Sequence, residues 1–516
     1  MEATDLHRPN FVFICTDQQR NDSLGCCGNP LAATPQLDRL AAEGVRFTCH
    51  NTPCPICSPS RATLFTGLYP RHHKLAVNGM ALDPEIPTLP FMLSQAGYRT
   101  YGIGKHHLQP ILAPDRFRMP ESEAFWRRPE SKDWMGPYYG FEEVQFVIGE
   151  ADKASQAGHY AQWLREQNPE LPHQLAANAA LETPPNDLDE VWKCALPADL
   201  HYNRWIARQA VKIINQVREP FFLFVSFPDP HHPFSPPRPY CDRFDPDKMV
   251  LPHKTSGELD KMPPYYRNVF RPGQKGVLKA YWESATDDEQ GFLLDTSNIS
   301  ETSLRLAIAH TYGMVTMIDD CVGKILEALD QNDISTSTVV LFTSDHGELL
   351  GDHGLLHKGP PPYRQLREIP LLMKGPGLPK GKVLDILSSH LDIMPTLLEM
   401  AGIPYETETF DGQTLGPFLK GRKVPEVGRE VIFGEYHPRS PQKLYNQTIQ
   451  TKKWRLTLYP QQPTWGEFFD LQADPHECNN LFADEQYTFI IKELSSKLHN
   501  AFPPQPTVSA IRIAKW

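Results

Sequence analysis

The sequence predicts an α/β protein with a large mixed, mostly parallel sheet, helices on both faces of it, and a small C-terminal antiparallel subdomain with a helix. Two observations support this fold class. Short apolar runs alternate with segments of helical spacing through most of the chain, and such alternation is typical of parallel strands joined by helices. Near the C-terminus the pattern changes to closely spaced short apolar segments, which favours an antiparallel sheet.

The individual elements follow from the same patterns. Continuous apolar runs predict buried strands at 11–15, 98–103, 221–227 and 339–342. Apolar residues spaced three and four apart predict helices at 203–217, 304–329 and 390–400.

We expect a main domain over residues 1–422 and a C-terminal subdomain over 423–516. Segments near 151–193 and 240–300 lack a clean period and are polar or rich in proline, so we expect them to be loop insertions at the edge of the sheet. In the C-terminal subdomain we expect strands at 430–434, 454–459 and 467–471, followed by a helix at 487–499.

Composition narrows the function. The chain has 516 residues, and its 51 basic and 62 acidic residues give a formal charge of -11. The charges form no long runs of one sign, which argues against a nucleic-acid partner and favours a small ligand. No stretch reaches the roughly 18 apolar residues of a membrane span. The sequence is also compatible with a homo-oligomer.

The N-terminal segment and the cysteines bear on the compartment in which the protein is found. Residues 1–9 lack the basic, apolar and small-residue regions of a signal peptide. The ten cysteines are scattered along the chain, which in a long chain is typical of reduced thiols. We therefore expect a cytoplasmic protein.

Polar residues capable of chemistry follow four of the predicted strands. Ligands of parallel sheets bind beyond the carboxyl ends of the strands, so these residues are expected to share one rim: Asp17 and Gln18; Lys105, His106 and His107; Asp229, His231 and His232; Asp345 and His346.

Two of these strand ends together offer a metal site. Asp17, Gln18, Asp345 and His346 supply mostly hard donors, which suit a divalent ion. We expect Ca²⁺, with Mg²⁺ as a second hard ion, and the softer donor His346 leaves Mn²⁺ and Zn²⁺ as further alternatives. A single aspartate at a strand end is more often a turn or capping residue, but two such pairs favour a metal.

The most specific motif is C-x-P-x-R at Cys57 to Arg61, which continues through Thr66 and Gly67. It resembles the signature of the formylglycine-dependent sulfatases of the alkaline-phosphatase superfamily. The resemblance implies that a separate formylglycine-generating enzyme oxidises Cys57 to formylglycine (3-oxoalanine). It also implies that the modified residue contacts the metal and that the substrate is a small sulfate ester.

The resemblance extends over most of the chain. Asp17, Asp345 and His346 lie where this family binds its metal, Lys105 and His107 match its G-K-x-H element, and His231 matches its P-H-x-P element. Lys358 follows the second metal motif, and residues 469–481 are similar to the family's C-terminal D-L-x-x-D-P-x-E-x-x-N-L element.

Each step of sulfate ester hydrolysis then has a candidate residue. A hydroxyl of the formylglycine hydrate at position 57 would attack sulfur, and Arg61 would hold the hydrate. Lys105, Lys358 and the metal would stabilise the sulfate oxygens. His231 or Lys358 would protonate the leaving alcohol, and His107 would deprotonate the second hydroxyl to release sulfate.

Two departures from the common sulfatase pattern keep a related reaction open. Gln18 and His346 are similar to the pair found in phosphonate monoester hydrolases, which use the same kind of site on phosphonate and phosphodiester substrates. Lys105 and His107 instead match the sulfatase element. We therefore expect a sulfatase (a sulfuric ester hydrolase), with phosphonate monoester or phosphodiester hydrolysis as the alternative.

The sequence gives less support to functions other than ester hydrolysis by a modified cysteine. Cys54 and Cys57 form a C-x-x-C pair, but a redox pair does not require the arginine and threonine that follow. Phosphatases of the same superfamily usually present serine or threonine in place of Cys57. A binding protein with an unconverted cysteine would not need the candidate acid and base.

Overall fold

The computed structural model describes residues 8–218, 220–269, 293–420, 429–437, 444–503 and 513–514. The predicted insertion at 240–300 therefore lies partly outside the described residues, as do the predicted boundary at 422 and most of the N-terminal segment 1–9. None of the helices in the described ranges combines the length and the apolar character needed to cross a membrane.

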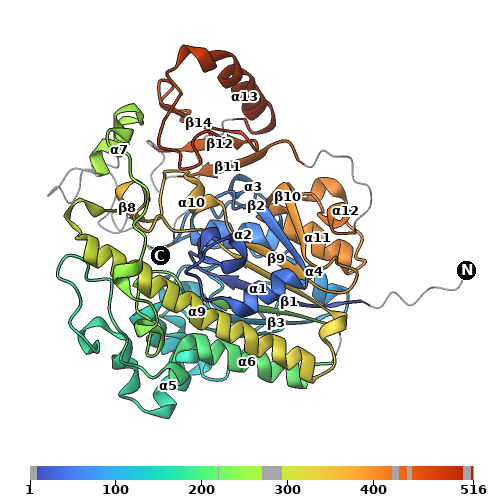
Figure 1. Ribbon diagram of the computed structural model, residues 1–516. Helices are drawn as coiled ribbons and strands as arrows, with labels where there is room; N and C mark the ends of the chain where they lie inside the picture. The colour runs from blue at the N-terminus through green and yellow to red at the C-terminus, as the bar shows by residue number, and fades with distance from the viewer. Residues whose placement is uncertain are drawn as a thin grey trace, which may run out of the picture.

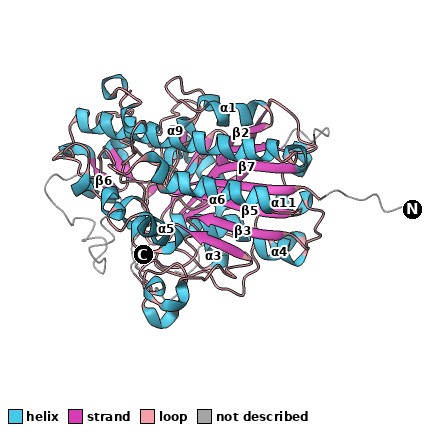
Figure 2. Ribbon diagram, turned by 90° about the horizontal axis from the view of Figure 1, so that it is seen from below, coloured by secondary structure: helices cyan, strands magenta, loops and turns pink. Residues whose placement is uncertain are grey.

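A large sheet of eight strands forms the centre of the molecule (Figure 2). Its strands lie in the order β10-β2-β9-β7-β1-β5-β3-β4, and only β9 runs antiparallel to its neighbours. Their bounds are β1 Asn10–Thr16, β2 Val45–Asn51, β3 Arg99–Gly104, β4 Glu143–Phe146, β5 Phe221–Phe227, β7 Thr338–Ser344, β9 Leu371–Lys374 and β10 Lys382–Ser389. This is the mixed, mostly parallel sheet expected from the sequence.

Helices cover both faces of this sheet (Figures 1 and 2). Successive side chains of a strand point to opposite faces of the sheet. In β1, Phe11 and Phe13 belong to the core cluster on one face, and Val12 and Ile14 belong to the cluster on the other. Both faces are therefore apolar and are covered by helices. The first cluster lies under α2 Cys57–Thr66, α4 Leu89–Gln95, α11 Ile393–Met400 and α12 Gly416–Leu419. The second lies under α1 Pro35–Ala42, α5 Gly158–Gln167, α6 Tyr202–Gln216 and α9 Glu301–Gln331.

The four strands predicted from apolar runs lie side by side as β7-β1-β5-β3 in the sheet. Four strands of the sheet were missed: β2, β4, β9 and β10. Their sequences mix polar and apolar residues, as in Val45–Asn51 (VRFTCHN), and β4 has only four residues. Such strands are recognisable only once their neighbours are known.

The C-terminal part forms a separate four-stranded antiparallel sheet in the order β11-β12-β13-β14 (Figure 1, top). Its elements are β11 Ile432–Tyr436, β12 Asn446–Gln450, β13 Trp454–Leu458, β14 Gly466–Asp470 and the helix α13 Thr488–Ala501. Leu494 and Leu498 of α13 pack on Ile449 and Leu456 of the sheet. The small antiparallel sheet and its helix were expected, although β12 was not predicted.

The predicted insertions contain local structure. Residues 151–193 include α5, whose Tyr160 and Leu164 are buried in the core. The remaining elements are short: α3 Pro70–His73, α7 Pro264–Val269, α10 Arg364–Arg367, and a two-stranded sheet of β6 Leu293–Asp295 and β8 Leu355–His357.

Candidate active site

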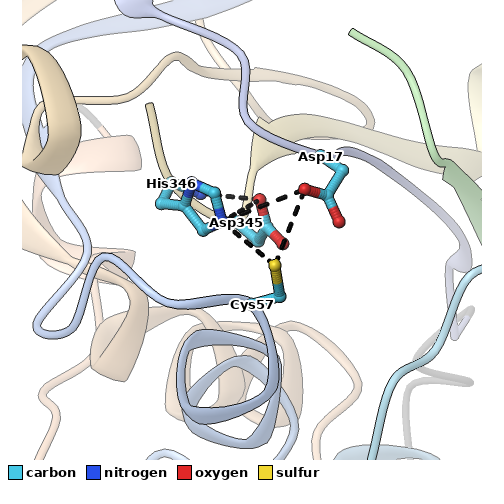
Figure 3. Close-up of side chains that lie close together, drawn as sticks. All are labelled: Asp17, Cys57, Asp345 and His346. Carbon is cyan, nitrogen blue, oxygen red and sulfur yellow. Dashed lines mark hydrogen bonds and ion pairs between the residues drawn. The ribbon is translucent and has the colours of Figure 1, made fainter. Parts of the chain in front are cut away.

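The site lies where the central strands end. Asp17 follows β1, and Asp345 and His346 follow its neighbour β7. Cys57 is the first residue of α2, so its side chain faces the same rim (Figure 3). One ligand atom from each of these four buried residues lies within 4.8 Å of the others.

These four side chains fit a divalent cation. The His346 Nε2 atom lies 3.3 Å from Cys57 Sγ, 3.9 Å from Asp17 Oδ1 and 3.7 Å from Asp345 Oδ1. The His346 Nδ1 atom lies 2.9 Å from the carbonyl oxygen of Gly347, so a proton on Nδ1 leaves the Nε2 lone pair directed at the group. Carboxylate oxygens and an imidazole nitrogen around one point are a metal-binding donor set.

Arg61 holds the two carboxylates in place. It is fully buried, and its Nε donates to Asp345 Oδ2 at 2.9 Å while its Nη2 donates to Asp17 Oδ2 at 3.0 Å. Its Nη1 donates to the Lys105 carbonyl oxygen at 2.7 Å and to Ser226 Oγ at 2.9 Å. The guanidinium therefore donates its hydrogen bonds to the two carboxylates, a backbone carbonyl and Ser226. The sequence predicts instead that it would hold the formylglycine hydrate at position 57.

The local charges set the pKa values of the group. Burial opposes ionisation of Asp17, but Lys105 and Arg61 outweigh it and hold its pKa well below the usual range. Burial and the neighbouring Asp17 raise the pKa of Asp345. For Cys57, burial and Asp17 oppose the thiolate, but Lys358, Lys105 and His346 outweigh them and lower the thiol pKa. The fixed positive charges therefore favour the anionic forms of Asp17 and Cys57, whereas Asp345 is held closer to its neutral form.

Most of the other predicted catalytic residues line one cavity. A cavity of about 160 Å³ is lined by Cys57, Lys105, His107, Ile111, Leu112, Glu123, Glu150, Lys153, Gln156 and His231. Lys358 does not line this cavity, but its Nζ lies 2.8 Å from Nε2 of His231, which does. The catalytic candidates Cys57, Lys105, His107 and His231 therefore share one opening.

Gln18 is not among the residues that line this cavity. Its Oε1 accepts a hydrogen bond of 2.7 Å from Lys358 Nζ, and its Nε2 contacts Glu348 and, at 3.0 Å, His232 Nδ1. Its backbone nitrogen donates to Asp345 Oδ1 at 3.0 Å. Its role as a metal ligand stays a prediction, while the contacts place it beside Lys358.

Sequence reasoning missed residues that support the site. The Glu150 carboxylate lies 3.0 Å from Lys105 Nζ, which also lies 2.8 Å from Asp17 Oδ2. Burial opposes both charges, yet the pairing raises the pKa of Lys105 and lowers that of Glu150 to about 2. Glu150 follows the short strand β4, so it was missed together with that strand.

Asn78 and the neighbourhood of Lys358 add further contacts. Asn78 Oδ1 accepts from the backbone nitrogen of Ser58 at 3.1 Å, which orients the first turn of α2. His357 Nε2 lies 2.7 Å from Glu190 Oε2, and its ring stacks on His232 at 3.7 Å. Glu190 and His232 are thus linked through His357, which is next to Lys358 in the chain.

Comparison with known proteins agrees with this geometry. A sequence profile described as "Sulfatase" matches residues 9–403, and one described as "N-sulphoglucosamine sulphohydrolase, C-terminal" matches residues 351–502. The chain belongs to the sulfatase family. The sulfatase profile covers both strand ends that carry the candidate metal ligands, and it covers the Cys57 motif.

Relatives of this sulfatase-family chain include sulfatases and a phosphonate monoester hydrolase. An arylsulfatase of Clostridium perfringens is 29% identical over 95% of both chains. A choline-sulfatase of Rhizobium meliloti is 25% identical and matches 92% of this chain and 83% of its own length. The crystal structure of the phosphonate monoester hydrolase of Agrobacterium radiobacter superposes with a TM-score of 0.78 at 26% identity, covering 96% of this chain and 95% of that one.

Proposed function

We propose that this sulfatase-family hydrolase cleaves a small sulfate monoester with Cys57, in its formylglycine form, as the nucleophilic residue. The observation that supports this most directly is the position of Cys57. It begins α2 within the group formed by Asp17, Asp345 and His346, and it opens into the cavity shared with Lys105, His107 and His231. Conversion of Cys57 requires a formylglycine-generating enzyme as a maturation partner.

A divalent cation held by Asp17, Asp345 and His346, with the side chain at position 57 beside them, would supply positive charge to the sulfate oxygens and favour an ionised hydroxyl at position 57. The formylglycine hydrate at position 57 would supply that hydroxyl. Arg61 positions the two carboxylates that define the place of the cation.

Two lysines would bind the negatively charged oxygens of the sulfate ester. Lys105 is fixed between Asp17 and Glu150, whose charges keep it cationic despite burial. Lys358 is held by its contacts with Gln18 Oε1 and His231 Nε2. Such fixed charges stabilise a transition state without needing to reorient.

Proton transfer is assigned to the histidines and Lys358. The His231 Nδ1 atom faces the carbonyl oxygen of His232, so Nδ1 holds a proton and Nε2 faces Lys358. This pair would protonate the departing alcohol. His107 lines the cavity, and within the described ranges neither of its ring nitrogens makes a hydrogen bond. It is therefore placed to accept the proton of the hydroxyl at position 57.

The proposal is tested by turnover of matched esters. Protein coproduced with a formylglycine-generating enzyme should hydrolyse an aryl sulfate with a larger kcat/KM than the corresponding aryl phosphonate monoester. A variant His107→Gln should lose on the order of 10²-fold or more in kcat, which is the usual contribution of a positioned base. Equal rates for His107→Gln and the unsubstituted protein would contradict its role.

Phosphonate monoester or phosphodiester hydrolysis is the second candidate. It is supported by the Gln18 and His346 pair and by the likeness to the Agrobacterium radiobacter enzyme. A larger kcat/KM on the phosphonate than on the sulfate would establish this alternative. The preference for Ca²⁺, the cytoplasmic location and a homo-oligomeric state stay predictions from the sequence.

A further inference from the structure

A second group of metal-binding side chain types lies outside the catalytic cavity. Glu258 comes from the predicted insertion, His353 from the turn between β7 and β8, and Cys478 from the loop after β14. One ligand atom of each lies within 4.8 Å of the others. The three residues are distant in sequence, so the fold brings them together from separate segments.

The histidine of this group lacks the partners that a buried imidazole normally has. His353 is 1% exposed, and in the part of the chain that the structure describes neither of its ring nitrogens makes a hydrogen bond. Its nearest acidic atom is Glu258 Oε1, 3.7 Å from Nδ1, and that oxygen also has no hydrogen-bond partner among the described residues. A buried polar atom without a partner calls for an explanation, and a bound ion or water is one of them.

The imidazole of His353 is also held in a fixed orientation. Its ring stacks on Tyr363 with a centroid distance of 3.6 Å and an interplanar angle of 7°. Its backbone has a φ of 58°, in the left-handed region that few residues other than glycine adopt. Packing therefore keeps the ring beside Glu258 and Cys478 instead of allowing it to turn toward solvent.

We propose that Glu258, His353 and Cys478 form a zinc site that is separate from the catalytic metal site. The proposal stands independently of the proposed sulfatase function. A thiolate, an imidazole and a carboxylate are together the ligand types that Zn²⁺ selects, whereas Ca²⁺ and Mg²⁺ prefer oxygen alone.

The geometry suits this ion. Zn²⁺ bonds of about 2.0–2.3 Å in a tetrahedron place ligand atoms roughly 3.3–3.8 Å apart. For a nitrogen and an oxygen ligand the expected separation is about 3.3–3.6 Å, so the 3.7 Å between His353 Nδ1 and Glu258 Oε1 needs only a small approach of the two side chains to hold the ion. Cys478 is only partly buried, so a water molecule has access to the fourth position.

The site would join the C-terminal segment to the main domain. Cys478 follows the small antiparallel sheet, and His353 follows the central strand β7. A metal bound by both would cross-link the two parts and stabilise their contact. This role is structural, because none of the three residues lines the catalytic cavity.

Alkylation kinetics test the proposal on the intact protein. Excess Ca²⁺ is added to occupy the catalytic site, and the protein is treated with iodoacetamide with and without Zn²⁺. Peptide mass spectrometry then follows Cys478 and, as an internal control, Cys49, which is also partly buried but lies outside the group. We expect Zn²⁺ to slow alkylation of Cys478 at least about tenfold and to leave Cys49 unchanged, because a metal-bound thiolate is a poor nucleophile.

A spectroscopic measurement identifies the ligands. In a Cys57→Ala background, Co²⁺ added in place of Zn²⁺ should produce thiolate-to-cobalt absorption in the near ultraviolet. Adding Cys478→Ser should abolish this absorption, whereas the matched change Cys49→Ser should retain it. His353→Gln should lower the affinity for Co²⁺ at least about 10-fold, since even residues that only support a ligand contribute this much. Equal alkylation of Cys478 with and without Zn²⁺, or absorption that survives Cys478→Ser, would overturn the proposal.

Discussion

Arg61 is the residue on which the geometry of the proposed metal site depends most. The side chain is fully buried and donates four hydrogen bonds, two of them to the carboxylates of Asp17 and Asp345. In Arg61→Lys the positive charge remains, but an ammonium group is a single point and cannot span both carboxylates and the backbone carbonyl.

The expected loss follows from these contacts. A hydrogen bond to a charged group contributes about 1.5–3 kcal/mol, and lysine would lose at least two of the four. We therefore expect Arg61→Lys to lower the free energy of unfolding by about 3 kcal/mol or more. Activity should fall on the order of 10²-fold, because the carboxylates would shift from their positions.

Urea unfolding with metal removed by a chelator measures the first effect directly. The exposed Arg127→Lys is a matched control, and it should change the free energy of unfolding by less than about 0.5 kcal/mol. A titration with Ca²⁺ or Mn²⁺ should then show weaker binding to Arg61→Lys than to the unsubstituted protein. Stability and metal affinity within error of the control would refute the assignment of Arg61 as the residue that positions both carboxylates.

Three further predictions concern the nucleophile, the C-terminal subdomain and a surface histidine. Cys57→Ser should accept sulfate once and release it poorly, because serine lacks the second hydroxyl of the hydrate. Mass spectrometry should detect the sulfated peptide. Steady turnover by this variant would contradict the proposal. Arg455 is buried between Glu467 and Glu477, so Arg455→Met should destabilise the protein by about 3–5 kcal/mol in urea unfolding, whereas the exposed Lys453→Met should have little effect. The hydrogen bond to Asp411 raises the pKa of His72, so its stabilisation is complete below the unfolded pKa and is lost as pH rises through the higher native pKa. Melting temperatures between about pH 6 and 8 should therefore fall less in His72→Gln than in the unsubstituted protein, and parallel pH profiles would contradict this.

The sequence was most informative where strands are buried on both faces. The apolar runs that became β1, β3, β5 and β7 stand out from their surroundings, and they lie next to one another in the sheet. The residues that follow them, such as Asp17, Lys105 and Asp345, can therefore be assigned to one rim from the sequence alone.

The rest required the three-dimensional structure. The strand β4 has only four residues with alternating burial, and Glu150 just beyond it could not be connected with Lys105 from the sequence. The use of Arg61 on two carboxylates depends on which atoms surround a buried guanidinium, which no sequence pattern specifies. The group of Glu258, His353 and Cys478 joins three distant segments, so spacing along the chain could not reveal it.

The most direct test of the proposed chemistry is peptide mass spectrometry at Cys57, combined with aryl sulfate turnover of the same preparation. Protein coproduced with a formylglycine-generating enzyme should carry the aldehyde at position 57, and turnover should rise in proportion to the fraction converted. Full turnover in a preparation in which Cys57 is entirely unmodified would contradict the assignment of formylglycine as the nucleophilic residue.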